Sequence, residues 1–162
     1  MIVRRLGVLA ALLLVLGGWK QTTMVLPGQP TGERAAQDQL PHSQSPLWAT
    51  LGKCAVRFDQ RKGVFSIQLT PDVRGMDGRD IDANGFVLPL DGSDNTRHFL
   101  LTKRTPVCLF CPPGEPNEVI EVRSKKAIAW DDDLVTMKGR FKLTNDGEKG
   151  VFFMLMDAEP VR

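Results

Sequence analysis

The stretch RDIDANGFVLPL (residues 79–90) carries an extended pattern that changes partway along. Before Gly85 the apolar side chains Ile81 and Ala83 share one face of the expected strand. After it the apolar set is Phe86, Leu88 and Leu90, which has the other parity. Because a change of parity turns all later side chains to the opposite face, we expect a bend or a β-bulge at Gly85. Strands that bend at a glycine and continue are typical of small barrels.

The segments around this stretch also have the alternation of strands. Residues 134–143 alternate apolar and mostly basic side chains, which predicts one face toward water, and residues 151–157 are apolar on both faces. One apolar helical turn is expected near Trp48. Shorter extended segments are expected at residues 54–58 and 65–69, and the five main strands at 79–90, 97–103, 118–123, 134–143 and 151–157. The sequence therefore predicts an all-β protein with a small five-stranded OB-like barrel, and a β-sandwich is the alternative.

Two of the three cysteines lie in TPVCLFCPPGEPNE (residues 105–118), between two of these strands. Cys108 and Cys111 have C-x-x-C spacing, so their thiolates can share a metal ion or close a small disulfide ring. A structural zinc site needs four ligands, so this pair would be half of a site and distant residues would complete it.

Three residues are candidates to complete such a site. His98 lies on the strand before the cysteine loop, Cys54 could approach by tertiary packing, and Glu115 is a weaker candidate. The alternatives are an ordinary surface histidine on a strand for His98 and a small buried apolar residue for Cys54. For the pair itself, the alternative is a structural disulfide that stiffens the loop.

The N-terminus resembles a secretion signal. Arg4 and Arg5 precede an apolar run at residues 6–16 that is too short to span a bilayer as a stable helix. We expect residues 1–18 to be a signal peptide cleaved after Gly17 or Gly18, with an uncleaved membrane anchor as the alternative. Residues 19–46 are rich in proline and polar residues and are expected to form a disordered linker, which leaves 47–162 as the barrel domain. The expected location is the periplasm.

Charge and motifs exclude several functions. Arg4 and Arg5 account for the formal charge of +2, because the chain has 21 basic and 19 acidic residues. The balanced remainder argues against nucleic-acid binding, which needs a basic surface. Pro112 and Pro113 follow the second cysteine, so the pair does not begin a helix as in thioredoxin-like enzymes. No nucleophile elbow, phosphate-binding glycine loop or H-E-x-x-H motif is present, and we expect a protein that is not an enzyme.

Three segments carry a family resemblance: GFVLPL (85–90), HFLL (98–101) and PVCLFCPPGEPNE (106–118) running into VIEV (119–122). They resemble the exported bacterial family called domain of unknown function 3299, over roughly Trp48 to the C-terminus. The resemblance implies an OB-like barrel, and some relatives are associated with transporter systems of the zinc-starvation response. Cys108 matches a position where the wider family keeps a cysteine, and His98 and Cys111 match a subgroup pattern. Cys54 rests on this sequence alone.

The resulting prediction is an exported accessory module for metal acquisition or delivery. Zinc is the expected metal, with Cys108, Cys111, His98 and Cys54 as ligands and a transporter component or another exported protein as partner. The alternative is a structural or interaction module in which a bond between Cys108 and Cys111 stiffens a partner-binding loop.

Overall fold

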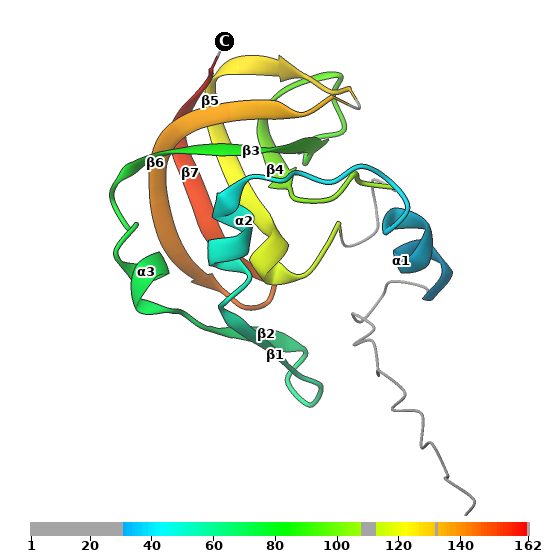
Figure 1. Ribbon diagram of the computed structural model, residues 1–162, viewed down its shortest axis with the longest axis vertical. Helices are drawn as coiled ribbons and strands as arrows, with labels where there is room; N and C mark the ends of the chain where they lie inside the picture. Colours follow the sequence, from blue (N-terminus) through cyan, green and yellow to red (C-terminus); the bar gives the residue numbers. More distant parts are fainter. Residues whose placement is uncertain (1–30, 108–112, 132, 162) are drawn as a thin grey trace, which may run out of the picture.

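The computed structural model describes residues 31–107, 113–131 and 133–161 of the chain. Its elements follow one another as short helices and strands (Figure 1). They are α1 (Thr31–Gln37), α2 (Pro46–Leu51), β1 (Ala55–Asp59), β2 (Val64–Gln68), α3 (Pro71–Arg74), β3 (Asp80–Pro89), β4 (Asn95–Thr102), the 3-10 helix η1 (Pro116–Glu118), β5 (Val119–Ala129), β6 (Val135–Asp146) and β7 (Val151–Pro160).

Five strands close into a barrel in the order β3-β4-β5-β7-β6, and β6 pairs with β3 to complete it. The β5–β7 pair is parallel and the other pairs are antiparallel. Each of the five main strands predicted from the sequence overlaps one of these barrel strands. The all-β class and the closed five-stranded barrel are therefore confirmed.

Gly85 marks a change of strand partner rather than a bulge. Strand β3 pairs with β6 through residues 80–85 and with β4 through 86–89, and neither pairing shows a register shift. The predicted bulge is wrong because β3 is buried on both faces after Gly85. Val87 faces the core cluster, and Phe86 and Leu88, which point to the other face, are buried as well. A Cβ at Gly85 would lie 2.5 Å from the carbonyl oxygen of Thr102, so the glycine allows the close approach of β4.

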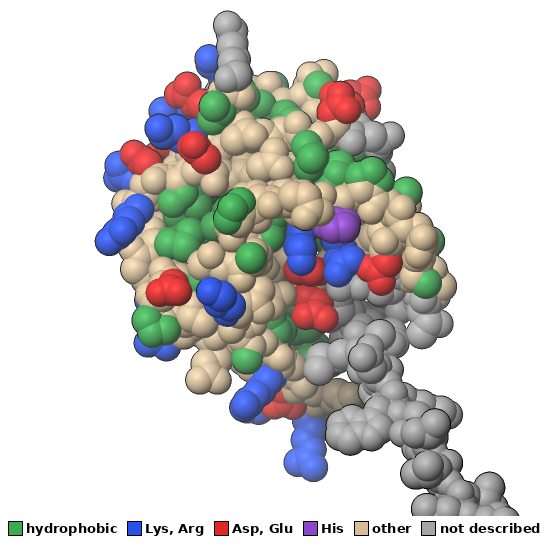
Figure 2. All heavy atoms as spheres, in the orientation of Figure 1, with side chains coloured by type: hydrophobic (Ala, Val, Ile, Leu, Met, Phe, Trp, Pro, Cys, Tyr) green, Lys and Arg blue, Asp and Glu red, His purple; other side chains and the backbone are tan. Residues whose placement is uncertain are grey.

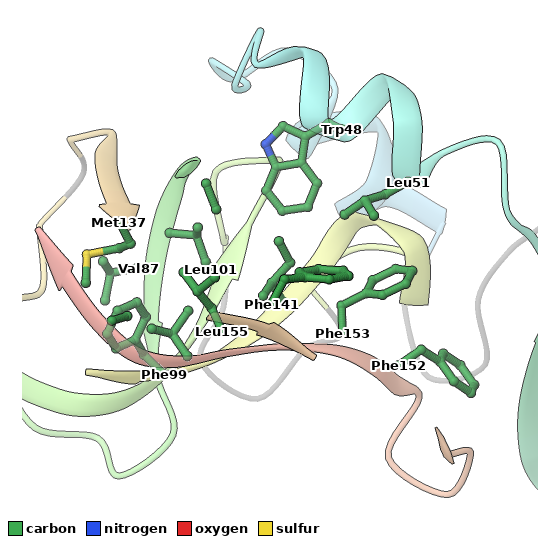
Figure 3. Close-up of a cluster of buried hydrophobic side chains, with 14 of the residues drawn as sticks. Trp48, Leu51, Val87, Phe99, Leu101, Met137, Phe141, Phe152, Phe153 and Leu155 are labelled. Carbon is green, nitrogen blue, oxygen red and sulfur yellow. The ribbon is translucent and has the colours of Figure 1, made fainter. Parts of the chain in front are cut away.

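Helix α2 closes one end of the barrel. It begins at a Ser45 cap, whose Oγ accepts from the backbone N–H of Leu47, and Pro46 occupies its first turn. Figure 3 shows Trp48 and Leu51 on the helix above Phe141 and Phe153 of β6 and β7. All four are among the buried residues of one hydrophobic cluster, so α2 is part of the barrel core.

Strands β1 and β2 form a separate hairpin beside the barrel. The backbone N–H of Phe65 donates to the carbonyl oxygen of Gly147 in the β6–β7 turn at 2.8 Å. The Phe65 ring also stacks at a tilt on Phe58, with 4.7 Å between centroids. The hydrogen bond to Gly147 joins the hairpin to the barrel, whereas the ring contact lies within the hairpin, between β1 and β2.

The structure differs from the predicted linker over residues 31–46. Helix α1 lies within it, and Gln37 and Ser43 are buried against the barrel. The Ser43 backbone N–H donates to the Lys103 carbonyl oxygen at 2.8 Å. Composition misled the prediction because this polar segment is held by hydrogen bonds to barrel backbone, with few apolar contacts of its own. Residues 1–30, including the predicted signal peptide, lie outside the described residues.

None of the helices in the described part of the chain has the length and apolar character needed to cross a membrane.

Candidate functional site

The connection between β4 and β5 contains the cysteine loop, and its two ends are joined by one side chain. The buried amide of Gln37, at the end of α1, donates from Nε2 to the carbonyl oxygens of Thr105 at 3.1 Å and Pro113 at 2.9 Å. Those two oxygens therefore lie within about 6 Å of each other. The described residues on either side of the cysteine pair, Thr105 and Pro113, are therefore held close together by Gln37.

A second fixing point is the carboxylate of Glu118, the last residue of η1. It pairs with Lys103 Nζ at 3.1 Å and with Arg104 Nε at 3.2 Å, and it accepts from the backbone N–H of Glu115 at 3.3 Å. The Glu118 side chain is only 11% exposed, and such a charge is tolerated because it is paired and hydrogen-bonded. These contacts hold the outgoing and returning limbs of the loop together.

The segment before α2 adds a third anchor. The Thr105 backbone N–H and hydroxyl both donate to the Pro41 carbonyl oxygen, at 3.3 and 2.7 Å. His42 forms an isolated antiparallel bridge with Arg104, and Arg104 also pairs with Asp38. The N-terminal segment therefore lies alongside the outgoing limb and is hydrogen-bonded to it.

His98 lies on the outer face of β4. It alternates with Phe99 and Leu101, which belong to the core cluster, so its side chain points away from the interior. Its Nε2 is 2.8 Å from Glu121 Oε1 on β5, and Arg123 Nη2 is 3.0 Å from the same oxygen. The His98 side chain is 33% exposed and therefore reachable from solvent.

The returning limb of the loop packs on the same outer face. Pro113 and Gly114 line a small cavity of about 80 Å³ together with Leu100 of β4. Leu100 is the next outward-facing residue after His98 along the strand, a spacing of about 7 Å. His98 therefore lies near the limb that carries the second cysteine of the loop.

Cys54 lies elsewhere. It is 2% exposed within the core cluster, and its carbonyl oxygen accepts from Asn117 Nδ2 at 3.0 Å, just before β5 begins. His98 pairs with Arg123, four residues beyond the start of β5, or about 13 Å along the strand. Two donors on one zinc ion lie within about 4 Å of each other. Cys54 and His98 therefore do not meet at one ion, which corrects the predicted four-ligand set.

Cys108 and Cys111 lie outside the described residues. Glu115, the weaker sequence candidate, is half-buried directly before η1. Within residues 31–107, 113–131 and 133–161, no three His, Cys, Asp or Glu side chains are arranged to hold a metal ion. A site at this loop therefore depends on donors from its cysteines in addition to His98.

The sequence of this chain matches a protein-family model. A family model described as "Protein of unknown function (DUF3299)" matches residues 32–153. The chain belongs to the DUF3299 family. The matched range begins inside α1, so it includes nearly all of α1 and the segment at residues 38–45 that follows it. The DUF3299 domain therefore extends further toward the N-terminus than the resemblance from Trp48 implied.

A solved structure is also similar, a DUF3299 family protein from Pseudomonas aeruginosa PAO1 determined by crystallography. The two chains are 16% identical, the match covers 85% of each, and the TM-score is 0.49. The search of curated proteins finds no match.

Sequence reasoning missed Gln37, Lys103, Arg104 and Glu118 as the residues that fix the loop of this DUF3299 domain. The motif EPNE at residues 115–118 was the available signal, because a proline one residue after Glu115 with a glutamate three residues after it is typical of a capped helical turn. The contact of Gln37 with this loop could not be predicted from the neighbouring sequence, since Gln37 and Pro113 are 76 positions apart.

Proposed function

We propose that this chain is an exported, non-enzymatic barrel module that binds a transition metal, zinc first, as an accessory to metal acquisition or delivery. The donors are Cys108, Cys111 and His98, and a water or Glu115 takes the fourth position. The observation that carries the proposal is the position of His98, on the barrel face against which the returning limb of the cysteine loop packs. A transporter component is the proposed partner.

The contact between His98 and Glu121 supports the histidine as a ligand. Metal-binding histidines usually donate their second ring N–H to a carboxylate, which fixes the ring and its tautomer. Glu121 Oε1 lies 2.8 Å from His98 Nε2, which leaves Nδ1 for the metal. Arg123 pairs with the same oxygen and holds the carboxylate in place. Thiolate and imidazole together are a donor set that suits zinc.

The barrel topology supports an OB-type assignment. Numbered within the barrel, the strand order is 1-2-3-5-4, and strands 3 and 5 are the parallel pair. In OB folds the face of strands 2 and 3 binds ligands. Here that face is formed by β4 and β5, the strands that carry His98 and Glu121.

The metal test uses reduced, exported protein. We expect uptake of about one zinc ion per chain, measured by isothermal titration calorimetry and elemental analysis, with proton release because the thiols ionise on binding. Cys108→Ser, Cys111→Ser and His98→Ala should each weaken binding at least about tenfold, and Glu121→Gln should weaken it about 10- to 100-fold.

His42→Ala and Cys54→Ser are the matched controls, because neither side chain lies on the proposed face. Both should keep zinc affinity, although Cys54→Ser places a hydroxyl in the core and should lower stability. If Cys108 and Cys111 are disulfide-bonded in protein isolated without oxidant, and the reduced protein takes up no zinc, the metal proposal is rejected. The alternative, an interaction module whose disulfide stiffens the loop, then stands. The anchoring of both loop ends by Gln37 favours that alternative as well.

Export is tested separately. Protein recovered from the periplasmic fraction is expected to begin after Gly17 or Gly18, because the apolar run at residues 6–16 directs secretion. N-terminal sequencing gives the result directly. A mature chain that begins at Met1 and sediments with membranes would favour the anchor.

A further inference from the structure

A surface groove of about 540 Å³ lies across β3, β5, β6 and β7, and we name it the charged groove. Gly139 and six charged side chains line it. The charged residues are Lys125, Lys138, Arg140, Asp80, Asp157 and Glu159. Figure 2 shows basic and acidic side chains interspersed at the upper left, on the side of the barrel where β6 and β7 lie. The volume is in the range of small-molecule sites, and the lining calls for a polar ligand.

Strand β7 carries a bulge where it borders the charged groove. On β6, Gly139 alone stands opposite both Asp157 and Ala158 of β7. Leu155 and Ala158 belong to the buried core cluster although they are three positions apart. The bulge therefore turns one additional side chain outward, and Asp157 is the exposed residue that lines the groove there.

The backbone of the bulge is unusual. Asp157 has a φ of 53°, in the left-handed region that favours glycine, and it is the only residue with a side chain in that region in the described part of the chain. Gly139 allows the bulge to lie close, because a Cβ there would be 2.8 Å from the carbonyl oxygen of Met156. The chain keeps a carboxylate where glycine would be less strained, and strain of this kind gathers at functional sites.

Four of the six charges are paired with one another. Lys125 Nζ lies 3.0 Å from Glu159 Oε1, and Arg140 Nε lies 3.7 Å from Asp80 Oδ1. The hydrogen bond and the charge of Glu159 raise the pKa of Lys125, and the charges of Asp157 and Asp80 act in the same direction. The three carboxylates therefore surround one lysine.

Lys138 and Asp157 are the remaining charges. Neither side chain forms an ion pair or a hydrogen bond with any residue that the structure describes. Lys138 stands opposite Glu159, two residues beyond Asp157, so the two positions are offset by about 7 Å along β7. The charged groove thus presents one free cation and one free carboxylate at a fixed offset.

This distribution of charge selects the ligand. A simple anion would face three carboxylates and a simple cation three basic side chains, so neither is favoured. A metal ion is not favoured either, because no three His, Cys, Asp or Glu side chains converge on one point in the described ranges. A zwitterion satisfies both free charges at once. Two extended residues span about 7 Å, which matches the offset between Lys138 and Asp157.

We propose that the charged groove binds a small zwitterion whose two charges are as far apart as the termini of a dipeptide. The ligand carboxylate pairs with Lys138 and its ammonium group with Asp157. The groove shares no residue with the cysteine loop, His98 or Glu121, so this binding does not depend on whether the loop binds a metal.

The test uses the full exported protein and alanylalanine as the probe in isothermal titration calorimetry. We expect saturable binding that weakens as salt rises, because the groove is open to solvent. Acetylation of the dipeptide removes its ammonium charge and amidation removes its carboxylate, and each should weaken binding about tenfold. Lys138→Gln and Asp157→Asn should do the same. Alanine should bind more weakly, because its charges lie only about half as far apart.

Two comparisons assign each contact. Asp157→Asn should have little further effect on the acetylated dipeptide, and Lys138→Gln little on the amidated one, since the partner group is already absent. Asp157→Gly removes the carboxylate and suits the left-handed backbone, so it should stay folded by circular dichroism and lose binding. Lys142→Gln is the matched control, because it removes an exposed lysine from the same strand outside the groove, and it should leave binding unchanged.

Several results would overturn the proposal. They are equal affinity for the free and the blocked dipeptides, equal affinity for alanine and alanylalanine, and equal losses in Lys142→Gln and Lys138→Gln. Undiminished binding by folded Asp157→Gly would also overturn it, because the carboxylate would then make no contact with the ligand.

Discussion

Trp48→Ala is expected to lower the free energy of unfolding by about 3–5 kcal/mol, which is a large fraction of the stability of a domain of this size. Trp48 is 2% exposed and fills the barrel end above Phe141 and Phe153 (Figure 3). The substitution leaves a cavity that α2 cannot close without losing its other contacts. It also removes the hydrogen bond from Nε1 to the Asn84 carbonyl oxygen at 2.7 Å.

Urea unfolding followed by circular dichroism measures this effect, with two comparison variants. Trp48→Phe keeps most of the apolar volume, and the Asn84 oxygen still accepts from Ser43 Oγ, so a cost of about 1–2 kcal/mol is expected. Trp130→Phe changes a tryptophan at an exposed position and should cost less than about 0.5 kcal/mol. Equal losses for Trp48→Ala and Trp130→Phe would show that α2 does not close the barrel.

Gly85→Ala is expected to destabilise the barrel by about 1–3 kcal/mol, toward the upper end of that range. The added Cβ would lie 2.5 Å from the Thr102 carbonyl oxygen and 3.0 Å from the Leu101 side chain. The first of these atoms belongs to backbone that is paired within the sheet, so it cannot rotate away. Relief requires β3 and β4 to separate where β3 changes partner from β6 to β4.

Gly32→Ala provides the matched control for Gly85→Ala. Gly32 lies in α1, and a Cβ there meets nothing within 4 Å, so the change should be neutral or stabilising by up to about 1 kcal/mol. Thermal unfolding followed by circular dichroism compares the two variants directly. Similar midpoints for Gly85→Ala and the unchanged protein would show that β3 and β4 are not closely apposed at this glycine.

The strands were predictable because their side-chain alternation is local. Strand β6 repeats apolar and mostly basic residues, and β7 is apolar on both faces, which identifies a half-exposed strand and a buried one without reference to any partner. The Gly85 bulge was predicted wrongly for the same reason. Parity identifies which faces are apolar, and it cannot distinguish a bulge from a strand that is buried on both sides.

The sequence by itself determined the strand content, the five-stranded barrel and the position of the cysteine pair between two strands. Only the tertiary structure decided that Cys54 belongs to the core while His98 faces outward beside Glu121, and that Gln37 and Glu118 hold the loop. The physical reason is the separation along the chain over which each kind of interaction acts. Alternation and turn chemistry act between residues a few positions apart, whereas the contacts that build the candidate site join residues up to 76 positions apart, and closure of the barrel brings them together.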